Sequence, residues 1–162
     1  MEIKKQNVIV TGAASGLGLE LTKQLLAEGA NVAAVDINEE NLKKLEVDLN
    51  SKNLKIYIVD MGNVESIKKF REDYKKDYSD VDIIINNAGI IQPFVKVGDL
   101  DDATINKTMN VNFFGPLNLI RLFMEDLTKD KKEQYIVNVS SMGGFFPFPG
   151  QTIYGASKAA LK

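Results

Sequence analysis

The fold follows from residues 7–18, Asn-Val-Ile-Val-Thr-Gly-Ala-Ala-Ser-Gly-Leu-Gly. The apolar, β-branched run at residues 7–10 predicts a short buried strand. A helix is expected from about Gly16 until Gly29 stops it. Its expected apolar face consists of Leu17, Leu21, Leu25 and Leu26. A strand, a glycine-rich turn and a helix in this order are typical of the first unit of a parallel α/β sheet.

The same alternation continues along the chain. Apolar runs predict further strands at residues 32–36, 56–60, 81–86 and 135–139. Helices are expected from about 38 to 50 with Leu42, Leu45 and Leu49 inward, at 64–78, at 101–128 and from about 152. Strands that alternate with helices predict a doubly wound, parallel α/β sheet of five strands, the Rossmann architecture. Because the strands are continuous apolar runs, we expect both faces of the sheet to be buried.

Composition excludes several kinds of chemistry. The chain contains no cysteine and no histidine. It therefore has no disulfide, no thiolate nucleophile, no zinc–sulfur site and no Ser-His-Asp triad. No metal site is expected, and proton transfer would fall to Tyr, Lys, Asp or Glu.

Charge and hydropathy limit the partners. The net charge is −2, so nothing draws the chain electrostatically to nucleic acid or to an anionic membrane. No apolar run approaches the roughly 18 residues of a membrane span, and the first residues lack the apolar stretch of a signal peptide. We expect a cytoplasmic protein whose partner is a small molecule.

Noteworthy residues follow every predicted strand. They are Gly12, Asp36, Asp60, the run Asn87-Ala88-Gly89, and Ser141. Ligands of doubly wound sheets bind at the carboxyl ends of the strands, so these residues are expected to lie together at one edge.

The glycines of the first turn predict a dinucleotide cradle. Gly12, Gly16 and Gly18 would permit a tight turn, close approach of a pyrophosphate and close helix–strand packing. With Ser15 and Leu17 they surround the start of the helix, where free N–H groups and the positive dipole end favour phosphate. The alternative is a loop that merely needs glycine.

Asp36 favours NAD over NADP. A carboxylate at the end of the second strand accepts hydrogen bonds from ribose hydroxyls and repels a 2′-phosphate. No Arg or Lys occurs at residues 13–17, and Ile37-Asn38 follow the aspartate. The alternative is that Asp36 caps the helix that begins near Asn38.

Tyr154, Lys158 and Ser141 predict proton-transfer chemistry. A tyrosine hydroxyl can take or give the proton of an alcohol, although a phenol ionises poorly near neutral pH. Lys158 lies one helical turn later on the same face, and its ammonium group, together with the positive nicotinamide ring of NAD⁺, would favour the phenolate. Ser141 could hold the substrate oxygen near Tyr154. Singly, these residues also fit an exposed helix pair and a turn serine.

The ordered motifs resemble those of the short-chain dehydrogenase/reductase family. They are the glycine turn at 11–18, Asn86-Asn87-Ala88-Gly89, Asn112, Ser141 and Tyr154-Gly155-Ala156-Ser157-Lys158. The resemblance implies an NAD(H)-dependent oxidoreductase that interconverts a secondary alcohol and a ketone by hydride transfer, with Tyr154 as acid/base. It further implies contacts of Lys158 with the nicotinamide ribose, of Asp60 and the Met61 amide with adenine, and a water relay at Asn112. The residues alone leave open a turn role for Asp60 and for Asn86-Asn87, and a surface role for Asn112.

Two residue sets summarise the expected site. The catalytic set is Asn112, Ser141, Tyr154 and Lys158. The cofactor-binding set is Gly12, Ser15, Gly16, Leu17, Gly18, Asp36, Asp60, Met61, Asn87, Ala88, Gly89, Tyr154 and Lys158. The loop at residues 145–149, Phe-Phe-Pro-Phe-Pro, fits a wall for an apolar substrate, core packing, or contact with a second subunit.

The end of the sequence suggests a missing C-terminal part. The last helix, with Tyr154 and Lys158, meets no glycine or proline stop. The doubly wound dinucleotide fold has six strands, and five are predicted here. We therefore expect residues 1–162 to be a single dinucleotide-binding domain truncated in that helix, and homo-oligomeric when full length. The alternative function is a non-catalytic dinucleotide-binding fragment.

Overall fold

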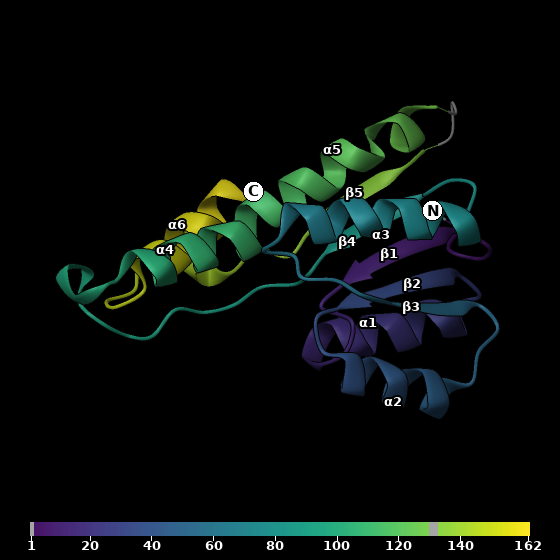
Figure 1. Ribbon diagram of the computed structural model, residues 1–162, viewed down its shortest axis with the longest axis horizontal. Helices are drawn as coiled ribbons and strands as arrows, with labels where there is room; N and C mark the ends of the chain where they lie inside the picture. The colour runs from purple at the N-terminus through teal and green to yellow at the C-terminus, as the bar shows by residue number, and fades with distance from the viewer. Residues whose placement is uncertain (1, 130–132) are drawn as a thin grey trace.

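The computed structural model describes residues 2–129 and 133–162. A five-stranded sheet with the order β3-β2-β1-β4-β5 forms the centre of the chain (Figure 1). The strands are β1 (Asn7–Thr11), β2 (Asn31–Asp36), β3 (Leu54–Ile58), β4 (Ile83–Asn86) and β5 (Tyr135–Asn138). All four pairings are parallel, which confirms the predicted doubly wound sheet.

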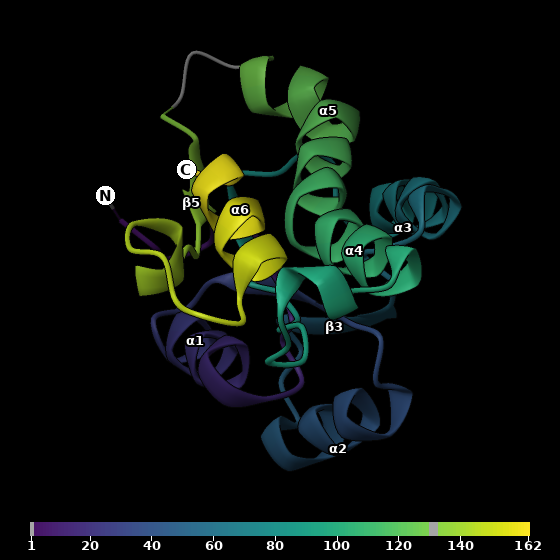
Figure 2. The same cartoon turned by 90° about the vertical axis from the view of Figure 1, so that its left-hand side faces the viewer.

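Helices cover both faces of the sheet. On one face α1 (Gly16–Ala27) and α2 (Glu39–Leu49) pack on alternate strand residues such as Val8 and Val32. On the other face α3 (Val64–Asp77) and α5 (Gly115–Thr128) pack on strand residues such as Ile9 and Ile84. The shorter helices α4 (Asp102–Met109) and α6 (Thr152–Ala160) lie side by side beyond the carboxyl ends of the strands (Figure 2).

The two edge strands depart from the expected burial. Ile136 and Val137 of β5 remain 42% and 44% exposed, whereas Ile9 and Val10 of β1 are fully buried. The third strand also begins two residues earlier than predicted, because Leu54 and Lys55 pair with Val32 and Ala33. The polar Lys55 hid this start, since an edge strand tolerates a charged side chain that a central strand would not.

The predicted single helix at 101–128 is interrupted in its middle. A π-helical segment, Asn110–Phe114, separates α4 from α5, and the Gly115 amide donates to Asn110 O, five residues back. Pro116 explains the interruption, because its ring clashes with the carbonyl four residues earlier and offers no N–H to it. Gly115 is needed as well, since a Cβ there would overlap the carbonyl oxygen of Met61.

Within residues 2–129 and 133–162, no helix combines the length and the apolar character that a membrane span requires.

Candidate functional site

A cleft of about 860 Å³ opens at the carboxyl edge of the sheet. It lies between the glycine turn before α1, the ends of β2, β3 and β4, and helix α4. Most of the predicted cofactor-binding residues line it, namely Gly12, Ser15, Gly16, Leu17, Asp36, Asp60, Met61, Asn87, Ala88 and Gly89. The sequence therefore located one wall of a real cavity.

The glycine turn is shaped by backbone contacts that exclude side chains. Gly12 has φ +68° and Gly16 has φ +50°, values that L side chains rarely adopt. A Cβ on Gly12 would come within 2.9 Å of Ala88 Cα, and one on Gly18 would overlap the carbonyl oxygen of Gly12. Gly18 thus lets α1 pack against the turn, as predicted, although it lies behind the cleft lining.

Gly16 differs, because a Cβ there would meet no described atom within 4 Å. The space beside it is open, as close approach of a ligand requires. Ser15 is the N-cap residue of α1, and its side chain makes no capping hydrogen bond within the described chain. The first N–H groups of this 12-residue helix therefore face the cleft without a side-chain cap, which fits an anionic group such as a pyrophosphate.

Leu17 corrects one expectation. It was assigned to the apolar face of the first helix, but it is 57% exposed and lines the cleft. Its place in the first turn of α1 puts it at the mouth of the cavity, while Leu21, Leu25 and Leu26 pack on the core as predicted.

Asn87 ties the loop after β4 to the glycine turn. Its Nδ2 donates to Thr11 O at 2.9 Å and to Gly12 O at 3.3 Å, and its backbone N donates to Thr11 Oγ1 at 3.1 Å. These bonds join residues about 76 positions apart in the sequence. Asn87 is therefore more than a turn residue, because its hydrogen bonds connect the loop after β4 with the glycine turn, and both border the cleft.

Asp36 sits at the end of β2 with both carboxylate oxygens oriented. Oδ2 accepts from Ala14 N at 3.0 Å and Oδ1 accepts from Asn38 N at 3.0 Å. The capping alternative for Asp36 is wrong, since the side chain of Asn38 caps α2 by accepting from Asn41 N. The aspartate instead joins the glycine turn to the end of β2 and borders the cleft.

Asp60 makes a turn interaction and also borders the cleft, so the predicted contact with adenine stays a prediction. Its Oδ1 accepts from Gly62 N at 2.8 Å, which is a turn interaction, and the residue also lines the cleft. The following Met61 is buried in the core on the α3 and α5 face of the sheet.

Ser141 and Tyr154 border the same glycine. A Cβ on Gly143 would lie 3.4 Å from Tyr154 Cε1 and 3.7 Å from Ser141 Oγ. Ser141 Oγ accepts from Gly143 N at 3.2 Å, so this serine also shapes the short 3-10 turn Met142–Gly144. Neither Ser141 nor Tyr154 lines the 860 Å³ cleft.

Lys158 is buried, so the alternative of an exposed Tyr–Lys pair on the last helix is wrong. The residue is 4% exposed, and its Nζ donates to Val139 O at 2.9 Å. Burial lowers the pKa of the Lys158 ammonium, because desolvation disfavours the charged form. A Cβ on Gly89 would lie 3.1 Å from Lys158 Nζ and 3.4 Å from Asn112 Oδ1, which places both polar groups beside the loop after β4.

Asn112 is fully buried in the π-helical segment, which contradicts the surface alternative. Its Oδ1 accepts from Ile90 N at 2.8 Å. Its Nδ2 donates to Ile90 O at 2.8 Å and to Ser157 Oγ at 3.0 Å. Asn112 therefore joins the loop after β4 to helix α6.

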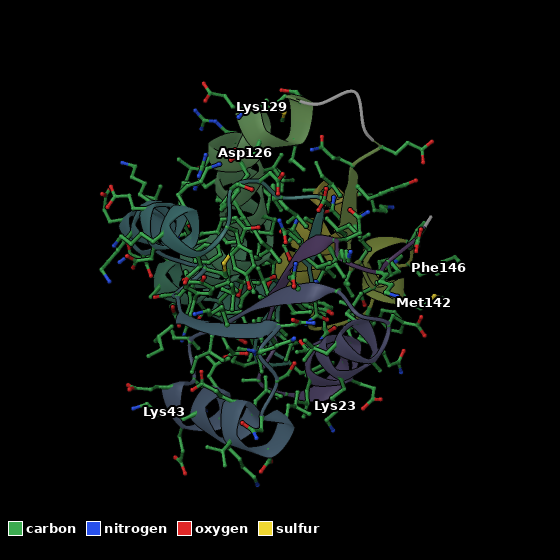
Figure 3. All side chains as sticks on the ribbon, turned by 90° about the vertical axis from the view of Figure 1, so that its right-hand side faces the viewer. Lys23, Lys43, Asp126, Lys129, Met142 and Phe146 are labelled. Atoms are coloured by element: carbon green, nitrogen blue, oxygen red, sulfur yellow. The ribbon has the colours of Figure 1, made fainter. Side chains whose placement is uncertain are left out.

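The loop at residues 145–149 is not part of the core. Phe145, Phe146 and Phe148 are 65%, 59% and 51% exposed, which excludes the core-packing alternative. Figure 3 shows Met142 and Phe146 at the periphery, away from the sheet. A substrate wall and a subunit contact both remain compatible with this surface.

Sequence reasoning missed half of the cleft and one buried side chain beside Tyr154. The additional lining residues are Ile37, Val59, Gly62, Ile90, Ala103, Asn106, Lys107, Asn110 and Val111. Most of these lie next to predicted residues or on α4, whose exposed face gave no signal of its own. Gln92 is 2% exposed and contacts the start of α6, yet in the sequence it is an ordinary loop residue before Pro93.

The sequence of the chain is similar to those of known oxidoreductases over nearly its whole length. The chain is 34% identical over 163 residues to the 3-oxoacyl-[acyl-carrier-protein] reductase FabG of Thermotoga maritima, covering 99% of the chain and 65% of that relative. It is 31% identical to 3beta-hydroxysteroid dehydrogenase 2 of Eggerthella lenta, covering 96% of the chain and 61% of that relative. The chain thus spans less than two thirds of the length of these proteins.

Solved structures show the same architecture. An NAD⁺-bound xylitol dehydrogenase superposes with a TM-score of 0.90 at 26% identity, over 99% of the chain and 62% of that structure. A short-chain dehydrogenase from Streptomyces avermitilis gives 0.89 at 27% identity, over 98% and 57%. The short chain dehydrogenase family model matches residues 6–162, and the chain therefore belongs to that family of oxidoreductases.

Proposed function

We propose that the protein is an NAD(H)-dependent oxidoreductase that interconverts a secondary alcohol and a ketone. The observation that carries the proposal is the cleft, which brings together Gly12 and Gly16 of the glycine turn and the carboxylate of Asp36. The names of the relatives support the reaction class, because they describe a 3-oxoacyl reductase, a hydroxysteroid dehydrogenase and a xylitol dehydrogenase.

The preference for NAD rests on Asp36. Its carboxylate is exposed enough to line the cleft, and Ala14 N and Asn38 N fix its orientation. Each oxygen keeps a lone pair for a ribose hydroxyl, whereas a 2′-phosphate would meet a like charge. Lys107 is the cation among the lining residues, and it belongs to α4 rather than to the glycine turn or the end of β2.

Side chains of the protein itself would transfer the hydroxyl proton of the substrate. When bound, the nicotinamide cofactor accepts or gives the hydride. Ser141 would hold the substrate oxygen, and the Tyr154 hydroxyl would take the alcohol proton or return it to the ketone. Lys158 is buried on the same helix, one turn after Tyr154, with its Nζ beside the loop after β4.

A parallel equilibrium titration with NADH and NADPH tests the cofactor assignment. The wild-type chain should bind NADH at least about tenfold more tightly, and Asp36→Ala should remove most of that preference. Asp48→Ala is a matched control, because Asp48 is an exposed aspartate on α2 outside the cleft. Tighter binding of NADPH by the wild type would overturn the NAD assignment.

A turnover assay with a panel of secondary alcohols and ketones tests the reaction. Tyr154→Phe should lower kcat by roughly 10²- to 10⁴-fold while the NADH dissociation constant stays within about twofold. Tyr135→Phe, which alters a partly buried tyrosine outside the cleft whose hydroxyl donates to Glu133, should change neither. Unchanged turnover in Tyr154→Phe would refute the catalytic assignment.

Binding without turnover is a second candidate. It is favoured by one observation, namely that Ser141 and Tyr154 lie outside the residues that line the cleft. Saturable NADH binding with no activity on the whole panel would support a dinucleotide-binding role for this chain.

A further inference from the structure

Helix α6, which carries Tyr154, begins without a cap of its own. Its N-cap residue is Gln151, whose side chain makes no capping hydrogen bond within the described chain. The first N–H groups of a helix need an acceptor, and the side chain of the N-cap residue usually supplies one for the second or third position. In α6 those positions are Ile153 and Tyr154.

The acceptor comes from a distant part of the sequence. Gln92 Oε1 accepts from Ile153 N at 2.8 Å and from Tyr154 N at 2.9 Å, across 61 and 62 residues. The Nε2 of the same amide donates to Gly150 O at 3.2 Å. One buried amide thus holds both the loop before α6 and the first turn of the helix.

The surroundings leave the Gln92 amide little choice of conformation. Gln92 is 2% exposed, so its polar atoms have no water to replace these partners. Gly150 has φ +78°, and a Cβ on it would lie 3.4 Å from the backbone of Phe94. The loop after β4 and the loop before α6 are therefore packed together where Gln92 connects them.

The backbone of Tyr154 is held on its other side too. Ser157 Oγ donates to Tyr154 O at 2.8 Å and accepts from Asn112 Nδ2. Within the described part of the chain the backbone N–H of Tyr154 has Gln92 Oε1 as its acceptor, so loss of Gln92 would release one side of the residue.

We propose that Gln92 is a positioning residue for Tyr154, acting as a non-local cap that fixes the start of α6. The proposal rests on the proposed function for its catalytic meaning, since Tyr154 is the acid/base there. A small displacement of a reacting group is sufficient to lower a rate by about 10²-fold. Gln92 would thereby set the rate of proton transfer without touching substrate or cofactor.

The test compares Gln92→Met with Gln92→Glu in the full chain. Methionine keeps the length of the side chain and removes both hydrogen-bonding functions, whereas glutamate keeps an acceptor in either protonation state. Gln134→Met is the matched control, because Gln134 makes two hydrogen bonds at the opposite end of β5, to Val81 O and Asp126 O.

Two readouts separate the proposal from the proposed function. Amide hydrogen exchange should quicken at least about tenfold at Ile153 and Tyr154 in Gln92→Met, and the ¹³C-labelled ring signal of Tyr154, assigned with Tyr154→Phe, should move. Gln92→Glu should restore both, and Gln134→Met should leave both unchanged. Neither measurement depends on turnover. Both therefore test the capping role of Gln92 even if the chain proves inactive.

Measurement of kcat tests whether the position of Tyr154 matters for catalysis. With the best substrate of the panel, Gln92→Met should lower kcat by about 10- to 100-fold, with NADH affinity within about twofold of wild type and recovery in Gln92→Glu. A changed ring signal with unchanged kcat would overturn the positioning role. Unchanged amide exchange and ring signal would overturn the cap itself, whatever the activity.

Discussion

The two sides of the sheet's carboxyl edge are built in different ways. Around β1 and β2 the edge is shaped by the backbone, through positive φ angles at Gly12 and Gly16 and through overlap that only glycine avoids at Gly18. Around β5 and α6 it is shaped by buried polar side chains that reach across the chain, such as Gln92 and Asn112. The first side follows from a local sequence motif, and the second requires the whole fold.

The strands on the two sides also differ in how deeply they are buried. The strands β1 and β2 lie between two layers of helices, whereas β5 is half-exposed and the phenylalanines of the loop at residues 145–149 point outward. The comparison teaches that the β1 and β2 side is shaped mainly by backbone geometry, whereas the β5 and α6 side depends on a few long-range side-chain contacts. Three pairs of variants and one pH comparison at Lys158 test that difference.

The largest effect is expected from Gly18→Ala. The added methyl group would overlap the Gly12 carbonyl, so α1 and the turn would have to separate at a cost of about 3 kcal/mol. Gly16→Ala meets no described atom and pays only for its positive φ, about 1 kcal/mol. Urea unfolding measures both, and equal losses in the two variants would show that the turn is not packed as described.

A second effect concerns the long-range contacts on the β5 and α6 side. Asn112→Ala would remove the partner of Ile90 N and Ile90 O and one of the two partners of Ser157 Oγ, which should cost about 2 kcal/mol of unfolding free energy. Asn63→Ala removes an exposed N-cap of α3 and should cost about 1 kcal/mol. If chemical unfolding found Asn112→Ala to be the milder change, the importance of the long-range contacts would be refuted.

A third pair of variants compares burial in the two regions directly. Val35→Ala in β2 removes two methyl groups from a fully buried site and should destabilise the chain by about 1.5 kcal/mol. Val137→Ala in β5 affects a side chain that is 44% exposed and should cost about half as much. Thermal unfolding of both variants checks the order, and a larger loss at Val137 would mean that β5 is covered in solution.

The smallest effect is a pH dependence at Lys158. Its folded-state pKa is lowered by burial, so the unfolded chain binds more protons between that lowered pKa and 10.5. Stability should therefore rise with pH through this window, and it should fall as the pH drops through the folded-state pKa. Relative to Lys158→Met, the wild type should gain stability as the pH rises across the window.

The Lys158 comparison is best made as a difference between the two proteins. Burial also raises the pKa of Tyr74, and that of Tyr78 to about 12, so both oppose stability above pH 10 in either protein. Their contribution cancels in the difference. Urea titrations from pH 7 to pH 10.5 that show a constant difference would contradict the burial of a charged Lys158.

The fold was predictable because its signals are local. Apolar runs located all five strands, and the alternation with helices implied the parallel pairing that the sheet shows. The errors arose where tertiary structure overrides the local pattern. Lys55 lies within β3 because an edge strand tolerates it, and Pro116 converts the middle of one predicted helix into a π-helical segment.

The candidate site was predictable to a different degree on its two sides. Gly12, Gly16 and Asp36 could be identified from their places after β1 and β2, since backbone geometry restricts those positions to few residue types. Gln92 could not, because a buried cap that acts over 61 residues leaves no local trace. The burial of Asn112 and its hydrogen bonds to Ile90 and Ser157 could not be predicted either, because they depend on the packing of α6 against the loop after β4.

The π-helical segment divides one long helix into two surfaces. An α-helix turns by about 100° per residue, so the additional residue in the wide turn rotates everything after it. Before the segment, α4 presents Ala103, Asn106 and Lys107 to the cleft, and after it α5 presents Leu119 and Phe123 to the core. Variation on the first surface can thus alter what the cleft accepts while the second keeps its packing, which separates ligand choice from fold stability within a single continuous helical element.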